Sequence, residues 1–194
     1  MHLPPARKTS KPFIAALSLV ALLGLSYSCR ADAPNRATRA AKLFNSFCLS
    51  APPNLSDIDR RAKAARYKVL VDRTIPMPHG ETMRQKNWLV PSSGGAPTML
   101  TTQSGVNGML YVFGCGIFAP DITHASMERA LSFLPRLGSP TKRAELPGGS
   151  SFVWWSARVG KVPPSESSQV MLAPDTPGMR GSTVSLMFET QLAH

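Results

Sequence analysis

The N-terminal segment constrains this chain most, because it decides which residues fold and in which compartment they do so. Arg7, Lys8 and Lys11 precede an apolar run over residues 13–25, and small or polar residues follow it. A secretion signal consists of a positively charged N-terminal region, a short apolar segment and a cleavage site of small residues, and this segment has all three. The run is shorter than the roughly 20 residues that a membrane-spanning helix needs. The sequence therefore predicts a signal peptide at residues 1–31 and a single exported domain at residues 32–194.

The end of this signal leaves two interpretations open, and Cys29 distinguishes them. Small residues at positions 26 and 28, or at 29 and 31, stand where signal peptidase cleaves, which would release the protein into the periplasm or the extracellular medium. In the second interpretation Cys29 is the acylated first residue of a lipoprotein, and lipid anchors the protein to a membrane. Ser26 and Ser28 replace the residues that usually precede such a cysteine, which favours the soluble product.

Two cysteines, Cys48 and Cys115, are kept whichever cleavage occurs. An even pair in an oxidising compartment favours one disulfide. The alternative is a thiol nucleophile that works with a histidine, but it needs a reduced cysteine, which the compartment disfavours. We therefore predict a disulfide that closes a long loop.

Helical periodicity is clearest near the start of the domain. Ala37, Ala40, Phe44 and Cys48 recur at three- and four-residue steps, which predicts an amphipathic helix over residues 35–48. Two prolines follow, and Ser56 is the expected N-cap of a second helix with Ile58, Ala62 and Ala65 on its buried side. A third helix is expected after Asp121 or Thr123 and should run to about Leu134.

Strand patterns follow the second helix. Residues 72–97 predict a loop around one short strand at residues 88–90, and residues 98–103 and 109–118 predict a strand pair. Gly114 and Gly116 flank Cys115 and should admit the helix that carries Cys48. Further strands are expected at residues 152–159, 169–173 and 183–191, and we expect both Trp154 and Trp155 in the core. This order predicts an α+β fold, with two N-terminal helices and one inserted helix packed on a mainly antiparallel sheet.

Positive charge is concentrated in the first part of the domain. Four of the 22 Lys and Arg residues precede Asp32, which leaves 18 bases against 11 acids, and residues 35–73 hold nine bases against three acids. A basic helical face of this kind can attract an anionic envelope component or another envelope protein, and it can also be only a solvated surface. We expect no nucleic-acid partner, because the protein is predicted to be exported and aromatic residues do not interleave with these bases. The candidate anion-binding residues are Arg60, Arg61, Lys63 and Arg66.

One helix also carries residues with catalytic chemistry. Asp121, His124 and Glu128 have helical spacing, so they could hold a divalent metal, or the two acids could simply suit the dipole of the helix N-terminus. The sequence contains no Gly-x-Ser-x-Gly or His-Glu-x-x-His motif, and we expect no cofactor. A binding module without catalytic activity is therefore the main hypothesis. The alternative is an envelope hydrolase, with or without metal, that uses the helix at residues 121–128.

Several of these features together resemble a loose group of small exported proteobacterial proteins of unknown function. The features are Leu43-Phe44-x-x-Phe47-Cys48, two prolines and a basic alanine-containing helix, followed by the Trp88 strand, Gly114-Cys115-Gly116-Ile117 and the Trp155 strand. The resemblance covers most of the exported domain. It implies that the two cysteines pair, and it implies no activity.

Overall fold

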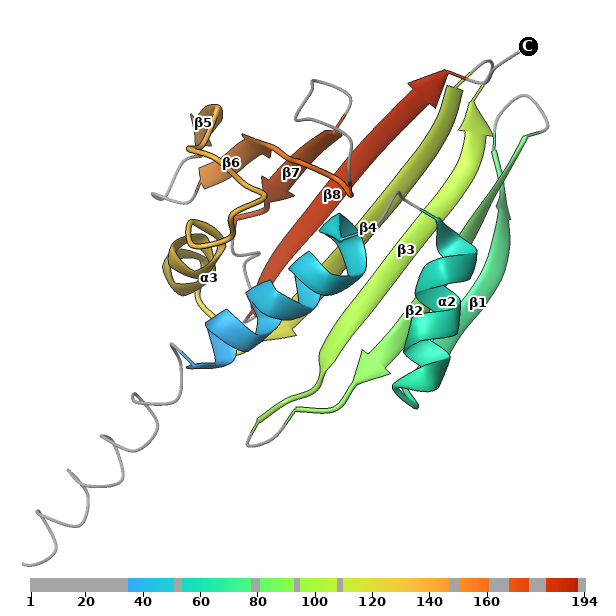
Figure 1. Cartoon of the computed structure of the whole chain (residues 1–194), viewed down its shortest axis with the longest axis horizontal. Coiled ribbons are helices and arrows are strands. Elements are labelled where there is room, and N and C mark those ends of the chain that lie inside the picture. The colour runs from blue at the N-terminus through green and yellow to red at the C-terminus, as the bar shows by residue number, and fades with distance from the viewer. Residues whose placement is uncertain are drawn as a thin grey trace, which may run out of the picture. The chain divides into compact units, whose positions relative to one another are not determined.

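The structure is a computed structural model that describes residues 35–50, 54–77, 81–92, 95–107, 110–146, 151–160, 168–174 and 181–191. These residues form an α+β domain in which strands predominate, and this coarse prediction is confirmed. All eight strands belong to one antiparallel sheet (Figure 1). The predicted signal peptide and Cys29 lie outside the described residues.

The sheet consists of two four-stranded meanders in the order β1-β2-β3-β4-β8-β7-β6-β5. The first meander contains β1 (Lys68–Pro76), β2 (Thr82–Val90), β3 (Thr98–Asn107) and β4 (Leu110–Pro120). The second contains β5 (Lys142–Glu145), β6 (Ser151–Ser156), β7 (Ser168–Leu172) and β8 (Gly181–Gln191). Pairing of β4 with β8 joins the meanders at the centre of the sheet, and helix α3 (His124–Leu131) lies between β4 and β5 in the chain.

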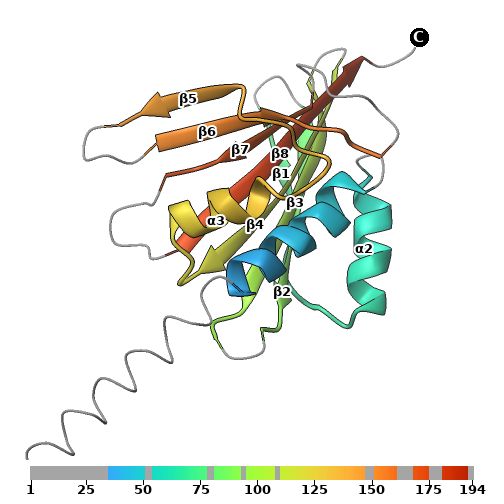
Figure 2. The ribbon, with the colours of Figure 1, turned by 60° about the vertical axis from the view of Figure 1, so that its left-hand side comes forward.

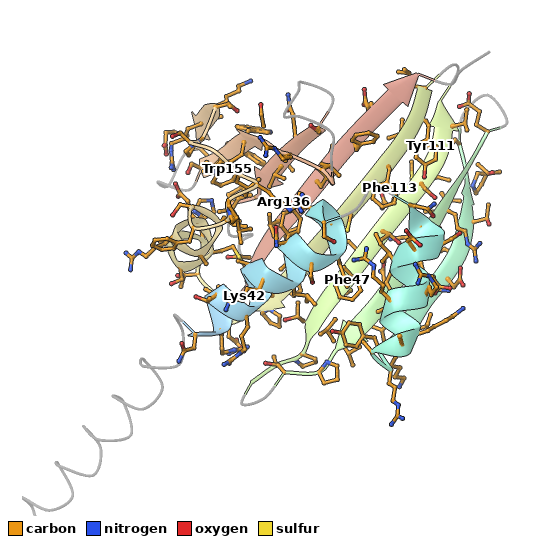
Figure 3. The ribbon with its side chains drawn as sticks, in the orientation of Figure 1. Lys42, Phe47, Tyr111, Phe113, Arg136 and Trp155 are labelled. Atoms are coloured by element: carbon orange, nitrogen blue, oxygen red, sulfur yellow. A yellow bond between two sulfur atoms is a disulfide. The ribbon has the colours of Figure 1, made fainter. Side chains whose placement is uncertain are left out.

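The helices lie together on one side of the sheet (Figure 2). Residues 35–44 form the first helix, which continues as a π-helical turn, η1 (Asn45–Leu49), and α2 (Leu55–Ala64) follows. The buried side of the first helix and η1 is the stripe seen in the sequence: Ala37, Ala40, Ala41, Phe44 and Cys48. Phe47 is partly buried between this helix and α2 (Figure 3), where its ring lies 5.7 Å from that of Tyr67.

The helix ends differ in detail from the sequence prediction. Asn54, not Ser56, caps α2, because its Oδ1 accepts hydrogen bonds from the backbone amides of Ser56 and Asp57 at 2.8 and 3.4 Å. Ala65 is the exposed C-cap of α2 and is not buried. Of the two caps considered for α3, Thr123 is the one used, and α3 ends at Leu131, before Leu134.

The prediction of a single short strand between residues 72 and 97 is wrong, because the end of β1 and all of β2 lie in this region. β1 is an edge strand whose residues are mostly exposed, and its apolar run, Val69-Leu70-Val71, lies before residue 72. A bulge between Val69 and Val71, together with Pro76, limits further pairing at this edge. In β2, Lys86 can occupy a buried position because two acidic residues neutralise it. A lysine at an inward position breaks the apolar alternation by which hydropathy identifies a strand.

The predicted disulfide between Cys48 and Cys115 is confirmed, and it links η1 to the central strand β4 with a Cα–Cα distance of 5.5 Å. The flanking glycines have a different role from the one expected. Successive residues of a strand point to opposite faces, so Gly114 and Gly116 face away from the helices. A Cβ on Gly116 would lie 2.8 Å from the carbonyl oxygen of Val184, so this glycine admits the neighbouring strand β8.

The core lies between the sheet and the helical layer. Its largest fully buried side chains include Trp88, Trp155, Phe44 and Phe113. The expectation that both adjacent tryptophans are buried is wrong, because strand alternation places Trp154 on the opposite face. There the ring of Trp154 stacks on Phe152 at 5.5 Å, and the ammonium of Lys142 lies 5.3 Å from its centroid.

Candidate functional site

The two faces of the domain differ in charge. On the open face of the sheet, the outward positions of β2, β3, β4, β6 and β7 carry no charged residue within the described ranges. The charged residues that face outward there are Lys68, Arg73 and Lys142 on the edge strands and Glu189 near the end of β8. The helical layer instead carries many arginines and lysines. The candidate site therefore lies on the helical layer.

The predicted basic cluster on α2 separates into residues with different roles. Arg60 forms an ion pair with Asp57 at 2.7 Å, and its side chain remains 75% exposed. Lys63 forms one with Asp59, also at 2.7 Å, and is 65% exposed. Exposed pairs of this kind contribute little to stability and yield readily to an external anion.

Arg61 differs from Arg60 and Lys63 because contacts within the helical layer hold its side chain. Its guanidinium donates hydrogen bonds to the backbone oxygens of Ser46 and Phe47 at 2.5 and 3.2 Å, and to the hydroxyl of Ser50 at 3.2 Å. It also lies 5.1 Å from the centroid of the Phe47 ring. Because these groups stand at the end of the first helical segment, Arg61 satisfies carbonyls that have no intrahelical partner and joins the two helices.

A buried network of ion pairs neutralises part of the positive charge near α2. The ammonium of Lys86 lies 2.7 Å from the carboxylate of Asp59 on α2 and 2.9 Å from that of Asp72 on β1, and Lys86 is 5% exposed. Burial by itself lowers the pKa of Lys86, but the two carboxylates outweigh it and hold the pKa above its usual value. Burial raises the pKa of Asp59, and the hydrogen bonds from Lys63 and Lys86 reverse this and lower it.

The free cations of the helical layer are largely ones that the sequence analysis did not single out. Arg39 and Lys42 lie one turn apart on the exposed side of the first helix, and Figure 3 marks Lys42 there. Arg66 is exposed in a left-handed conformation just after α2, with φ 58°. No hydrogen bond or ion pair joins these three side chains to another described residue. The signal for the first two was present in the sequence, since both lie off the apolar stripe of their helix.

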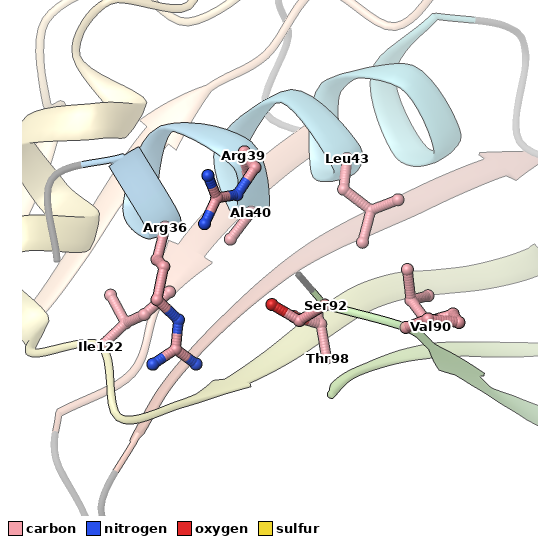
Figure 4. Close-up of a pocket in the computed structure, with 9 residues that line it drawn as sticks. Arg36, Arg39, Ala40, Leu43, Val90, Ser92, Thr98 and Ile122 are labelled. Atoms are coloured by element: carbon pink, nitrogen blue, oxygen red, sulfur yellow. The ribbon is translucent and has the colours of Figure 1, made fainter. Parts of the chain in front are cut away.

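A cavity of about 150 Å³ opens beside the first helix (Figure 4). Arg36, Arg39 and Leu43 line it from the helix, and Val90, Ser92 and Thr98 line it from the strand ends below. No acidic residue is among the side chains that line this cavity. The hydroxyls of Ser92 and Thr98 have no partner among the described residues, so they remain available to a ligand.

Arg36 is held rigidly at one end of this cavity. Its Nη2 donates to the backbone oxygens of Pro120 and Ala96 at 3.1 and 3.4 Å, and its Nη1 lies 3.8 Å from a carboxylate oxygen of Asp121. Its side chain is 13% exposed. A Cβ on Gly95 would lie 2.5 Å from the Arg36 Cζ, so a larger residue there would have to displace the guanidinium.

The three candidate metal ligands do not converge. Asp121 lies before α3 in a left-handed turn with φ 60° and faces Arg36. Glu128 accepts a hydrogen bond from Arg143, and its other oxygen lies 3.9 Å from His124 Nδ1. Across the described ranges, no three His, Cys, Asp or Glu residues come close enough to hold a metal ion.

Every helix within the described ranges falls short of the length and apolarity that crossing a membrane requires. No protein-family model matches the chain, and neither a curated protein nor a solved structure shows significant similarity to it.

Proposed function

We propose that this protein is an exported binding module of the cell envelope, and that its helical layer binds an anionic envelope component. In this proposal the two N-terminal helices and the inserted helix form the binding layer, and the sheet supports it. The observation that carries the proposal is the placement of Arg39, Lys42 and Arg66, which are exposed on the helical layer and have no described partner.

Charge asymmetry supports an extended anionic surface as the target. Clusters of Lys and Arg are attracted to anionic lipid surfaces by about 1 kcal/mol for each cation near the surface. The helices lie on one side of the sheet (Figure 2), and they carry the exposed cations Arg39, Lys42 and Arg66 or are followed directly by them. On the opposite face, β2, β3, β4, β6 and β7 carry no outward charge within the described ranges, and the outward charge of the central strand β8 is the acidic Glu189. A molecule with this distribution approaches an anionic surface with its helices first.

The proposal also includes the compartment in which the protein works, which lies outside the cytoplasm. The charged start and short apolar run over residues 1–31 support export, and the Cys48–Cys115 disulfide suits an oxidising environment. The proposed product is a soluble protein of the periplasm or extracellular medium, and acylation of Cys29 remains the alternative. The resemblance to small exported proteobacterial proteins likewise stays a prediction.

Vesicle flotation tests the proposal with protein purified after export. We expect the protein to float with phosphatidylglycerol vesicles and not with phosphatidylcholine vesicles, and to dissociate as salt rises toward 1 M, where the Debye length is about 3 Å. The double variant Lys42→Glu/Arg66→Glu should bind anionic vesicles at least about thirtyfold more weakly.

A matched control reverses the same amount of charge on the other face. Arg73 and Lys142 are exposed on the edge strands and face away from the helices. The variant Arg73→Glu/Lys142→Glu should therefore bind anionic vesicles within a few-fold of the unaltered protein. Equal losses of vesicle affinity in the two variants would show that only net charge matters. No loss of affinity in either variant would show that the helical layer does not bind the vesicles.

A further inference from the structure

We infer that the cavity beside the first helix binds a phosphate monoester carried on an apolar group. This inference rests on the proposed function and narrows it, because it assigns one headgroup to one site. Elsewhere on the helical layer, cations attract an anionic surface without a defined partner. In the cavity, two guanidiniums and two hydroxyls border a single half-open hollow.

The polar side of the cavity suits a doubly charged tetrahedral anion. Arg39 contributes a guanidinium with no partner among the described residues, and Arg36 keeps its Nε and part of Nη1 available after its bonds to the carbonyls. Ser92 and Thr98 add hydroxyl donors on the opposite side (Figure 4). A phosphate monoester carries about −1.5 to −2 charges at pH 7 and three strong acceptor oxygens, which matches two cations and two hydroxyls better than a single carboxylate does.

The remainder of the cavity is apolar. Leu43, Val90 and Ile122 line it together with Ala40, so the wall next to the phosphate site favours a hydrocarbon group over water. A volume of about 150 Å³ is roughly ten times the 10–15 Å³ that a cavity needs in order to hold one water molecule. The cavity thus has room for a phosphate and the first carbons attached to it, and the rest of the ligand must lie outside.

The carboxylate of Asp121 partly neutralises the positive charge that Arg36 presents to a ligand in the cavity. It lies 3.8 Å from Arg36 and is 54% exposed, and Asp121 is not one of the residues that line the cavity. Arg39 has no such neighbour in the described part of the chain. We therefore assign the larger share of phosphate binding to Arg39 and a positioning role to Arg36.

Calorimetric titration with hexyl phosphate tests this assignment, because the probe is soluble and needs no membrane. The unaltered protein should bind one equivalent saturably, and inorganic phosphate should bind about tenfold or more weakly, since it makes no apolar contact. Arg39→Gln should weaken hexyl phosphate binding by about tenfold or more, because it removes a charge-assisted hydrogen bond. Arg73→Gln is the matched control: it makes the same substitution on the open face of the sheet, does not line the cavity, and should alter the affinity less than about twofold.

Vesicles distinguish a lipid headgroup from a free phosphate ester. Phosphatidic acid carries a monoester and phosphatidylglycerol a diester, so a lipid ligand predicts stronger flotation on phosphatidic acid at equal surface charge, with competition by hexyl phosphate. Hexyl phosphate binding without this preference supports a soluble phosphate ester. The inference is overturned if hexyl phosphate does not bind saturably, if inorganic phosphate binds with the same affinity as hexyl phosphate, or if Arg39→Gln and Arg73→Gln have equal effects. Flotation on phosphatidylglycerol could still persist then, and the proposed function would stand without the site.

Discussion

Lys86 on β2 forms an ion pair with Asp59 on α2 at 2.7 Å, and this contact joins the helix to the sheet. Lys86→Met would leave Asp59 without its buried partner. We expect the free energy of unfolding to fall by about 2 kcal/mol, which is less than a fully buried pair would give because Asp59 is 20% exposed. Urea unfolding measures this. Lys63→Met is the control, since Lys63 pairs with the same carboxylate but is 65% exposed, and its effect should stay below about 1 kcal/mol.

The same network predicts how stability depends on pH. The pKa of Asp59 lies below its usual value of 3.8 in the folded protein, so its contribution to stability is present above that value and is lost as the pH falls through the folded pKa. The pKa of Lys86 lies above 10.5, so its contribution is present below that value and is lost as the pH rises through the folded pKa.

The urea midpoint should therefore fall below about pH 4 and again above about pH 10.5. Burial also raises the pKa of Tyr67 and Tyr111, so both tyrosines add to the loss on the alkaline side. Asp59→Asn should flatten the acid limb of the curve. An unchanged acid limb in that variant would contradict the role given to the Lys86–Asp59 pair.

Arg61 and Arg60 are neighbours in α2 with different expected effects. Arg61→Gln removes hydrogen bonds to the end of the first helical segment and the contact with the Phe47 ring, so it should lower the free energy of unfolding by about 2 kcal/mol. Arg60→Gln should leave the urea midpoint unchanged, because the Arg60 side chain is 75% exposed. Equal midpoints for the two variants would show that Arg61 is an ordinary surface residue.

The two glycines of β4 provide another matched comparison. Gly116→Ala would place a Cβ 2.8 Å from the Val184 carbonyl oxygen, which should destabilise the protein by about 1–3 kcal/mol. At Gly114 the nearest atom would lie 3.7 Å away, so Gly114→Ala should be neutral or slightly stabilising. Thermal unfolding of both variants measures the difference, and a destabilised Gly114→Ala variant would contradict the described packing of β4 against its neighbours.

The α+β class and the Cys48–Cys115 disulfide could be predicted from the sequence because each depends on a simple signal. Strand alternation and helical stripes indicate the class, and an even number of cysteines in an exported domain indicates the pairing. β1 and the start of β2 could not be predicted in this way. Their inward positions include Asp72 and Lys86, which neutralise each other only after the strands and α2 come together.

The candidate site shows the same limit. The sequence indicates that residues 35–73 are basic, but hydrogen bonding decides which of these cations remain free. Arg61 contacts carbonyls 14 and 15 residues away in the sequence, and Arg36 contacts carbonyls 60 and 84 residues away. Such contacts follow from the tertiary fold, so the sequence alone does not separate the bonded Arg36 and Arg61 from the exposed Arg39.

Lysine footprinting on vesicles tests the central claim most directly, because it uses the unaltered protein. Lys42 and Lys63 are exposed on the helical layer, and Lys142 is exposed on the opposite face. Acetylation followed by mass spectrometry compares their reactivity in solution and on phosphatidylglycerol vesicles. We predict that the vesicles protect Lys42 and Lys63 and leave Lys142 as reactive as in solution. Protection of Lys142 with unchanged labelling of Lys42 and Lys63 would contradict binding through the helical layer.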